Sequence, residues 1–473
     1  MKQTDVVVIG AGPGGYAAAF CAADQGHQVI LIEKRKRLGG VCLNQGCIPS
    51  KALLHVAKLI KEAKDSENRG VSFSEPKIDL EKMRHWKNCI IEKLSQGVQF
   101  VASKRNVEVI CGEAHFENST TVSIKTEEGD RQINFKKAII ATGSKPALPS
   151  VFDLGSPHIM TSTEALELND IPKDLLVIGG GYIGMELGTV YSALGSNVVV
   201  VEALSGILTG ADPDLARYVL NYAQENFKDI RLSTKVASMS LEGDKVKVAF
   251  EGSGELKEEL YDKVLVSVGR VPNSEGLGLE NTQVQKTDTG FIQVNNQQQT
   301  QDPNIYAIGD VSGGVLLAHK ASKEARIAVG ALSGNEGSNE FLIPAVVFTD
   351  PEVAWVGLTH EEAKEKDIPV NVARFPWAAS GRANSFDRPD GLTKLIIEPE
   401  TDKILGVGIA GHGAGELIAE GVLAVEKGLI ARDLAEIVHP HPTLSETLKE
   451  CAEAYYDECT HVAPRNRNKR PID

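Results

Sequence analysis

Hydrophobic residues along the chain fall into short continuous runs, and several of these runs are followed by a turn and a segment of helical period. The first run, Val6–Ile9, precedes a glycine-rich turn, a helical pattern over Tyr16–Ala23 and a second apolar run at Gln28–Ile32. Apolar runs of this length, bounded by glycine, indicate buried strands. The pattern therefore predicts an α/β domain at the start of the chain.

The order of strand, glycine-rich turn, helix and strand occurs again from Leu175. Both turns read G-x-G-x-x-G, with Gly10, Gly12 and Gly15 in the first copy and Gly179, Gly181 and Gly184 in the second. In each copy an acid, Glu33 or Glu202, lies 23 residues after the first glycine. Such glycines let the backbone approach a pyrophosphate at a helix N-terminus, and the acid can hold ribose hydroxyls. The sequence thus predicts two Rossmann-like dinucleotide-binding domains.

Each copy later reaches a closing strand that ends on a glycine turn, at Gly143 in the first and Gly269 in the second. The first copy is longer, with 133 residues between its first and closing glycines against 90 in the second. We expect the additional length to hold an insertion that carries a pair of cysteines and their helices.

The second copy favours NAD over NADP as its ligand. Glu202 would repel a 2′-phosphate, and the following residues 203–206 contain no arginine to bind one. For the first copy we expect FAD, because a bound flavin is the usual link between hydride and thiol chemistry. A later short strand, Ile305–Gly309, ends on Asp310, which could contact the flavin ribityl chain or serve as a helix N-cap.

The insertion contains the segment GGVCLNQGCIPSK, in which four residues separate Cys42 from Cys47. A helix is predicted to begin at Pro49, which places Cys47 at a helix N-terminus, where a thiolate is stabilised. We interpret the pair as a redox-active disulfide. The alternatives are a zinc site, a structural crosslink and two buried free thiols.

From Phe341 onward the pattern changes to alternating strands and helices without a phosphate-binding turn, which predicts a third, α+β domain that serves assembly. Near its end the segment VHPHPTLSE contains two prolines that hold it extended and fix where His439 and His441 point. A histidine beside a thiol-exchange site is a natural acid–base group. Glu446 could orient His441, or it could complete a capping box with Thr443.

The composition is that of a globular protein, with 42% hydrophobic and 24% charged residues and a formal net charge of −14. This charge disfavours nucleic acid as a partner, and no apolar stretch is long enough for a membrane span. The first strand follows the opening five residues at once, so we expect no signal peptide and a cytoplasmic location. A short basic run, residues 465–470, is expected to be a solvated end.

Taken together, the cysteine segment, both glycine fingerprints and the segments ATGS, SVGRVPN, YAIGD and HPHPTLSE resemble the dihydrolipoyl dehydrogenase branch of the flavin disulfide reductase family. The resemblance implies a homodimer whose domains span residues 1–148 (FAD), 149–273 (NAD), 274–342 (central, completing the FAD site) and 343–473 (interface). It implies that Cys47 faces the flavin while Cys42 exchanges with substrate, and that Lys51 pairs with Glu186. His441 with Glu446 would act on the other subunit's disulfide.

The implied reaction is the oxidation of dihydrolipoamide to lipoamide with NAD⁺, with lipoyl domains of 2-oxoacid dehydrogenase complexes, or the glycine cleavage H protein, as partners. Another flavin disulfide reductase and a soluble transhydrogenase are the alternatives. The residues after Glu202 argue against an NADPH-dependent reductase, and the cysteine pair with His441 argues against a simple transhydrogenase.

Overall fold

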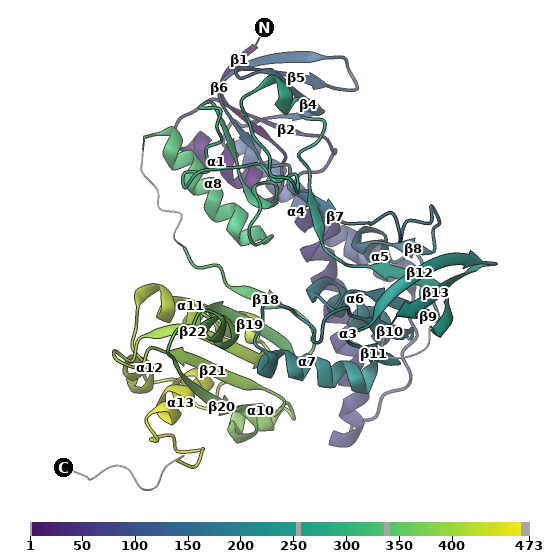
Figure 1. Ribbon diagram of the computed structural model, residues 1–473, viewed down its shortest axis with the longest axis vertical. Helices are drawn as coiled ribbons and strands as arrows, with labels where there is room; N and C mark the ends of the chain where they lie inside the picture. Colours follow the sequence, from purple (N-terminus) through teal and green to yellow (C-terminus); the bar gives the residue numbers. More distant parts are fainter. Residues whose placement is uncertain (1, 252–256, 335–340, 465–473) are drawn as a thin grey trace.

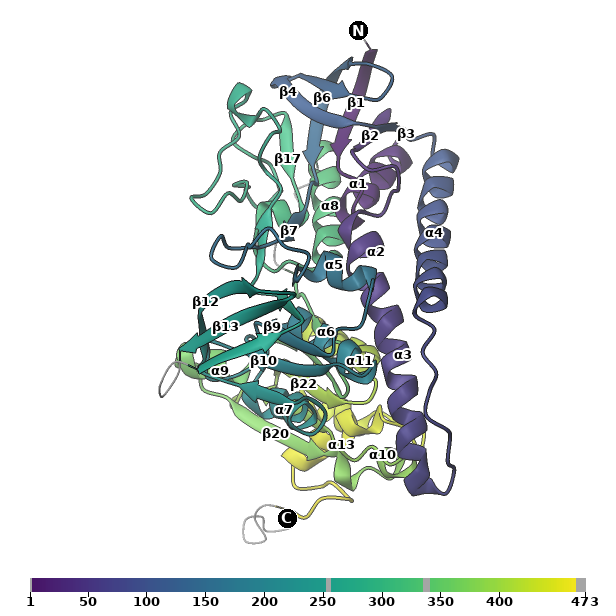
Figure 2. The ribbon, with the colours of Figure 1, turned by 90° about the vertical axis from the view of Figure 1, so that its right-hand side faces the viewer.

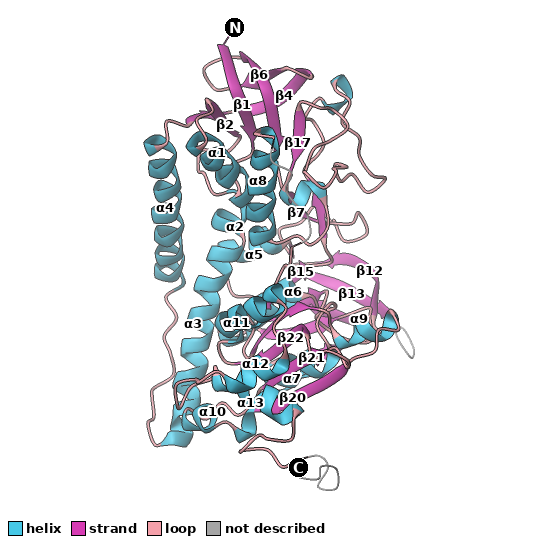
Figure 3. Ribbon diagram, turned by 90° about the vertical axis from the view of Figure 1, so that its left-hand side faces the viewer, coloured by secondary structure: helices cyan, strands magenta, loops and turns pink. Residues whose placement is uncertain are grey.

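The computed structural model describes residues 2–251, 257–334 and 341–464, so the basic run at 465–470 lies outside the described residues. Figure 1 shows a first sheet near the N-terminus, a second sheet beside it in the middle of the chain, and a third near the C-terminus. The fold is mixed α/β, as predicted, and its strands and helices are distinguished by colour in Figure 3.

The first sheet is built on parallel strands in the order β3-β2-β1-β6, extended by the antiparallel strands β5 and β4, while β17 also pairs with β6. The strands of this sheet are β1 (Lys2–Ile9), β2 (Val29–Glu33), β3 (Glu108–Cys111), β4 (Glu113–Asn118), β5 (Thr121–Lys125), β6 (Arg131–Ile140) and β17 (Ile305–Ala307). Two helices, α1 (Pro13–Asp24) and α8 (Ala318–Leu332), lie together on one face (Figure 1). The strand after residue 300 therefore completes the sheet that begins at the N-terminus.

The second sheet is entirely parallel, in the order β11-β10-β9-β15-β8. Its strands are β8 (Ile159–Met160), β9 (Asp174–Ile178), β10 (Asn197–Val201), β11 (Asp229–Arg231) and β15 (Lys263–Val266). An antiparallel sheet packs on one face through buried apolar side chains, and it consists of β12 (Lys235–Glu242), β13 (Lys245–Glu251) and β14 (Lys257–Tyr261). Helix α6 (Tyr182–Ala193) covers the other face.

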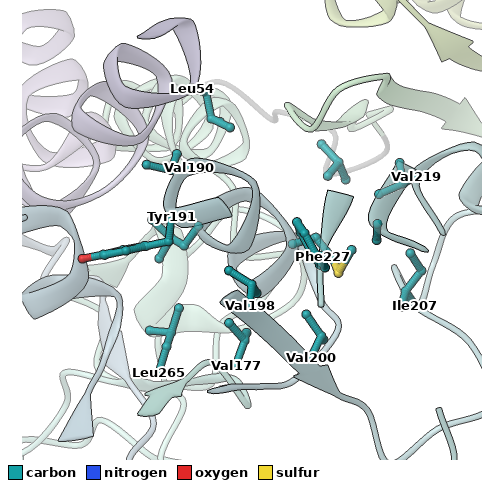
Figure 4. Packing of buried hydrophobic residues seen from close by; sticks show 14 of the residues in the cluster. Leu54, Val177, Val190, Tyr191, Val198, Val200, Ile207, Val219, Phe227 and Leu265 are labelled. Atoms are coloured by element: carbon teal, nitrogen blue, oxygen red, sulfur yellow. The ribbon is translucent and has the colours of Figure 1, made fainter. Parts of the chain in front are cut away.

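The core under α6 joins the second unit to the insertion. Val190 and Tyr191 of α6 pack on strand residues such as Val177 and Val198, and Leu54 joins them from the inserted helix α3 (Cys47–Asp65) (Figure 4). Each fully buried aliphatic side chain contributes about 1.5–3 kcal/mol. The cysteine-bearing insertion is thus anchored in the core of the second unit.

The insertion lies between β2 and β3 and contains α2 (Gly40–Gln45), α3 (Cys47–Asp65) and α4 (Leu80–Lys104), which run alongside both sheets (Figure 2). Helix α3 begins at Cys47, two residues before the predicted start, because the Ser50 N–H already donates to the Gly46 carbonyl. The separate helix that carries Cys42 was not predicted. Leu59 of α3 is apolar but 59% exposed, so it does not belong to the buried face of this helix.

The third sheet has the order β18-β19-β22-β21-β20 with antiparallel pairing throughout. Its strands are β18 (Ala345–Val347), β19 (Glu352–Gly357), β20 (Asn371–Pro376), β21 (Leu392–Ile397) and β22 (Ile404–Gly411). The helices α11 (Ala414–Lys427), α12 (Ala431–Glu436) and α13 (Glu446–Tyr455) follow it in sequence. In β20 the buried Ala373 and Phe375 flank Arg374, which pairs with Asp214 of the second unit at 2.8 Å.

Four further helices connect strands within the second and third sheets, namely α5 (Ser162–Glu167), α7 (Pro213–Asn226), α9 (His360–Glu365) and α10 (Gly381–Ser385). The segments after Gly143 and Gly269 pair with each other as an antiparallel ribbon of β7 (Ser144–Pro146) and β16 (Arg270–Pro272). This ribbon connects the two nucleotide-binding units. Among the described residues, no helix combines the length and apolar character needed to cross a membrane.

Candidate active site

A cavity of about 670 Å³ lies where the first sheet, the inserted helices and α6 meet. Most of the predicted site residues of the first unit line this cavity, namely Gly10, Gly12, Glu33, Cys42, Cys47, Lys51 and Gly143. Two predicted residues from later in the chain, Glu186 and Asp310, line it as well. Its volume is typical of a site for a cofactor or small ligand. The structure therefore brings the first fingerprint and the cysteine pair to one place.

The glycines of the first fingerprint are required by the backbone. Gly10 has a φ of +97°, and a Cβ there would lie 2.5 Å from the Ala141 carbonyl oxygen. A Cβ on Gly15 would lie 1.8 Å from the Gly10 oxygen, so the helix can approach the strand only without a side chain. Helix α1 begins directly after Gly12, and its first turn lines the cavity, so the N–H groups that have no partner within the helix lie at the cavity.

Glu33 is buried at the end of β2 and is held by backbone groups. Its Oε2 accepts a hydrogen bond from the Ala11 N–H at 2.8 Å, and its Oε1 accepts one from the Arg35 N–H at 3.0 Å. The carboxylate is thus fixed at the cavity wall, where a ribose would lie next to the pyrophosphate turn.

The second fingerprint repeats this geometry. Gly179 has a φ of +108°, with the Ser267 carbonyl oxygen 2.6 Å from a Cβ built there, and Gly184 packs as closely on Gly179. Glu202 accepts from the Gly180 N–H at 2.7 Å and the Leu204 N–H at 2.8 Å. Gly181 precedes the first residue of α6. The guanidinium of Arg231 on the neighbouring strand is already bound by Asp229 and Glu259.

Cys42 and Cys47 face each other at the cavity, with their Sγ atoms 2.8 Å apart and Cys42 donating. That hydrogen bond lowers the pKa of Cys47, and the Lys51 ammonium adds to the effect, against the opposing influence of burial. The same bond and burial raise the pKa of Cys42. Cys47 is also the first residue of α3, where the helix dipole favours a thiolate. The close pair fits a redox-active disulfide in its reduced form.

Lys51 and Glu186 form the ion pair that the resemblance implies. Lys51 Nζ lies 2.8 Å from Glu186 Oε2, and the Glu186 side chain is only 4% exposed. Glu186 Oε1 also accepts from the Phe348 N–H at 3.0 Å, and the ammonium stands 4.4 Å from the centre of the Phe348 ring. One carboxylate therefore joins α3, α6 and the third domain.

Asp310 lies in the cavity wall and does not cap a helix, since Ile308 precedes the short 3₁₀ turn that contains it. Its Oδ2 accepts from Ser144 Oγ at 2.5 Å, and Ser144 Oγ accepts from Arg270 Nε at 2.7 Å. We did not single out Ser144 or Arg270 from the sequence. Their signal was their position directly after the closing glycines, Gly143 and Gly269.

The histidine segment lies elsewhere in the chain. Glu446 uses both oxygens, since Oε1 pairs with His441 Nδ1 at 3.0 Å and Oε2 accepts from the Thr443 N–H at 2.8 Å. Glu446 thus contacts His441 and also takes the Thr443 N–H, but the predicted capping box is not formed, because α13 begins at Glu446 and Thr443 Oγ1 bonds to Pro440 and Ser445 instead of to the helix. The His441 side chain is 72% exposed, and it does not line the cavity of its own chain. His439 is instead held by Glu420 at 2.8 Å.

The residues present fit a flavin dinucleotide in the first unit and a nicotinamide dinucleotide in the second. The evidence is the pair of glycine cradles that a Cβ would fill, each beside a fixed carboxylate. Among the described residues, no group of three or more His, Cys, Asp or Glu side chains is arranged to hold a metal ion.

The chain belongs to the pyridine nucleotide-disulphide oxidoreductase family, whose sequence model matches residues 4–325. The dimerisation domain of the same family matches residues 343–452. Members of this family use FAD and NAD. The predicted resemblance is therefore confirmed.

The relatives span the whole chain. Proteins named dihydrolipoyl dehydrogenase are 46% identical in Buchnera aphidicola over 97% of both chains, and 43% identical in Vibrio cholerae over 99% of both. Among solved structures, LpdA from Mycobacterium tuberculosis has a TM-score of 0.87 at 26% identity, covering 96% of this chain and 99% of its own. The HOCl-induced flavoprotein disulfide reductase RclA from Escherichia coli has a TM-score of 0.85 at 28% identity, covering 95% and 99%.

Proposed function

We propose that the protein oxidises dihydrolipoamide to lipoamide and reduces NAD⁺ to NADH, with FAD as the resident carrier. The observation that supports this most strongly is the pair of thiols in the wall of a cavity that the first fingerprint also lines. The names of the full-length relatives supply the substrate class. The protein would act as a cytoplasmic homodimer on lipoyl domains of 2-oxoacid dehydrogenase complexes, or on the glycine cleavage H protein. The division at residues 148, 273 and 342 stays a prediction.

Thiol exchange starts from the Cys42–Cys47 disulfide. His441 of the partner subunit accepts a proton from one thiol of dihydrolipoamide, and the resulting thiolate attacks Cys42 Sγ. The Cys42–Cys47 bond breaks as the mixed disulfide forms, and Cys47 leaves as a thiolate that Lys51 and the α3 N-terminus stabilise. The second substrate sulfur then displaces Cys42 Sγ and closes the lipoamide ring. Its proton passes to Cys42, which becomes a thiol, while the first proton stays on His441.

The two electrons gained by the cysteine pair then leave for NAD⁺. Bound FAD supplies this two-electron link between thiols and nicotinamide, which restores the disulfide. In the first unit Glu33 would hold the FAD ribose and Asp310 the ribityl chain. In the second, Glu202 would hold the NAD ribose.

The position of His441 supports its delivery from the other subunit. Figure 2 places α13, which follows His441, at the far end of the molecule from α2 and its Cys42. The exposed imidazole, its Glu446 partner and the match to a dimerisation domain support a role across the interface. Val438, beside this segment, is 92% exposed in the single chain, as expected for a residue that a second subunit covers.

The test is a mixed dimer of Cys42→Ser and His441→Ala subunits. If His441 crosses over, one site of each heterodimer carries both changes and the other is intact, so exchange between two inactive homodimers gives each heterodimer about half of one wild-type dimer's activity. If His441 acts within its own chain, each site carries one change and stays inactive, which contradicts the shared site. Activity with free dihydrolipoamide and NAD⁺ is the readout, and subunit exchange is checked separately by a mass tag.

A further inference from the structure

A buried ion pair on α8 lies directly behind the cavity and takes no part in the thiol chemistry. Lys320 Nζ and Glu324 Oε1 are 2.7 Å apart, and their side chains are only 7% and 6% exposed. They stand one helical turn apart on α8, the helix that packs beside α1 in the first unit. Ala318 and Ala321 of the same helix line the cavity.

Both members of the pair hold one residue of the cavity wall. Glu324 Oε2 accepts from the Gly309 N–H at 2.7 Å, and Lys320 Nζ donates to the Gly309 carbonyl at 3.3 Å. Gly309 has a φ of +76°, in the left-handed region, and it directly precedes Asp310. The ion pair therefore fixes the peptide that presents Asp310 to the cavity.

A buried ion pair in this position is poorly explained by stability alone. Removing two charges from water costs several kcal/mol per ion, and apolar residues of similar volume are often as stable or more so. Burial raises the pKa of Glu324, against the opposing effects of Lys320 and the Gly309 N–H. What the pair supplies, and an apolar pair would not, is a donor and an acceptor placed on both polar groups of Gly309.

We propose that Lys320 and Glu324 are positioning residues for FAD, which they serve by holding the Gly309 turn so that Asp310 points at the flavin side of the cavity. They act through Gly309 and Asp310 and do not contact the cofactor themselves. The inference rests on the proposed function only in taking this cavity as the FAD site.

The test compares Lys320→Met/Glu324→Leu and Glu324→Gln with the wild type. The readouts are the FAD dissociation constant, followed by flavin fluorescence on dilution of the holoenzyme, and the melting temperature at saturating FAD. A matched control is Lys61→Met/Asp65→Leu, which removes a more exposed pair of the same spacing from α3. We expect the double variant to bind FAD at least about tenfold more weakly, the effect of one buried hydrogen bond left unmade. The control should leave FAD affinity unchanged.

A merely structural role would lower the melting temperature and leave FAD affinity unchanged, and that result overturns the inference. If the double variant does not fold, Glu324→Gln decides alone, because it keeps the size and one acceptor while removing the charge. Its FAD affinity should fall at least about threefold, and an unchanged value overturns the inference. A wild-type protein that binds no FAD overturns the proposed function, whereas normal binding in wild type and variants overturns only this proposal.

Discussion

The two nucleotide-binding units share one fingerprint geometry and differ in what surrounds it. Glu33 and Glu202 each accept two backbone hydrogen bonds at 2.7–3.0 Å. One comes from the N–H two residues further along the chain, and the other from an N–H in the glycine turn of the same unit. The residue two positions after the acid is Arg35 in the first unit and Leu204 in the second. The backbone thus sets a common dinucleotide cradle, and side chains decide which ligand and which chemistry each cradle serves.

The clearest difference lies in the helix that follows each turn. The residue seven positions after the first glycine is Ala17 in α1 and Glu186 in α6, and the Glu186 side chain lines the cavity of the first unit. The first unit holds the thiols in its insertion, and the second supplies the charge that binds Lys51. We therefore expect that substitutions in the first unit can stop thiol exchange while nucleotide reduction by the second unit continues.

The largest effect should come from Cys42→Ser. Turnover with dihydrolipoamide should fall by at least about three orders of magnitude, because the sulfur attacked by substrate is gone. NADH-dependent reduction of an artificial dye, which needs the second unit and flavin but no thiol, should remain. Steady-state rates with both acceptors check this, and equal loss of the two activities would contradict the division between the units.

Matched substitutions in the two fingerprints should separate the cofactors. Alanine at Gly10 or Gly179 forces a Cβ into a carbonyl oxygen at 2.5 or 2.6 Å and strains a positive φ, at a combined cost of about 2–4 kcal/mol. Gly10→Ala should weaken FAD about 30- to 1,000-fold, while Gly179→Ala should keep FAD and weaken NADH. FAD content and NADH titration of each variant are the measurements. Loss of FAD from Gly179→Ala would show that the cradles are not independent.

A smaller effect concerns the choice of nucleotide in the second unit. NAD⁺ should exceed NADP⁺ in kcat/KM by about 100-fold, because Glu202 accepts from ribose hydroxyls and repels a phosphate. Glu202→Arg should narrow this ratio, whereas Glu33→Gln, the counterpart in the first unit, should not change it. An unchanged ratio in Glu202→Arg would remove the argument from the second fingerprint.

The smallest predicted effect is a shift in the titration of Cys47. Its pKa is lowered, so the thiolate is present above that depressed pKa and is lost as the pH falls through it. In a Cys42→Ser background, Lys51→Met should move the midpoint of the thiolate-to-flavin absorption band upward by about one unit, since a cation is removed. Glu186→Gln should move it downward, because the Glu186 charge raises the Cys47 pKa. Shifts of the same sign in both variants would contradict this electrostatic account.

Much of this arrangement could be predicted from local sequence. Glycine spacing, the acids after the second strands and the cysteine pair are local patterns with direct physical meaning, and their elements are present in the fold. Contacts over long sequence distances could not be found in that way. The Ser144–Arg270 hydrogen bond and the hold of Glu186 on the Phe348 N–H join residues more than 100 positions apart. The resemblance, not the pattern, supplied Lys51 with Glu186.

Local pattern also left two questions that only geometry could answer. Whether Glu446 completes a capping box or contacts His441 was one: Oε1 pairs with His441, and Oε2 accepts from the Thr443 N–H without a capping box, since α13 begins only at Glu446. The start of α3 at Cys47 depends on the Gly46 carbonyl, which the proline-based prediction did not consider. Both questions concern which backbone or side-chain groups a residue contacts within about one helical turn, and sequence patterns do not resolve contacts at that scale.

The central claim is that one pair of thiols carries electrons from the dithiol substrate to the bound flavin and so to NAD⁺, and an anaerobic titration tests it most directly. Stoichiometric dihydrolipoamide, added without NAD⁺, should produce the long-wavelength absorption band of a Cys47 thiolate beside oxidised flavin. NAD⁺ added next should abolish the band and yield about one NADH per subunit, by the balance of two electrons per disulfide. A band that persists in the presence of NAD⁺, or NADH formed by the Cys42→Ser protein at the same rate, would contradict the account.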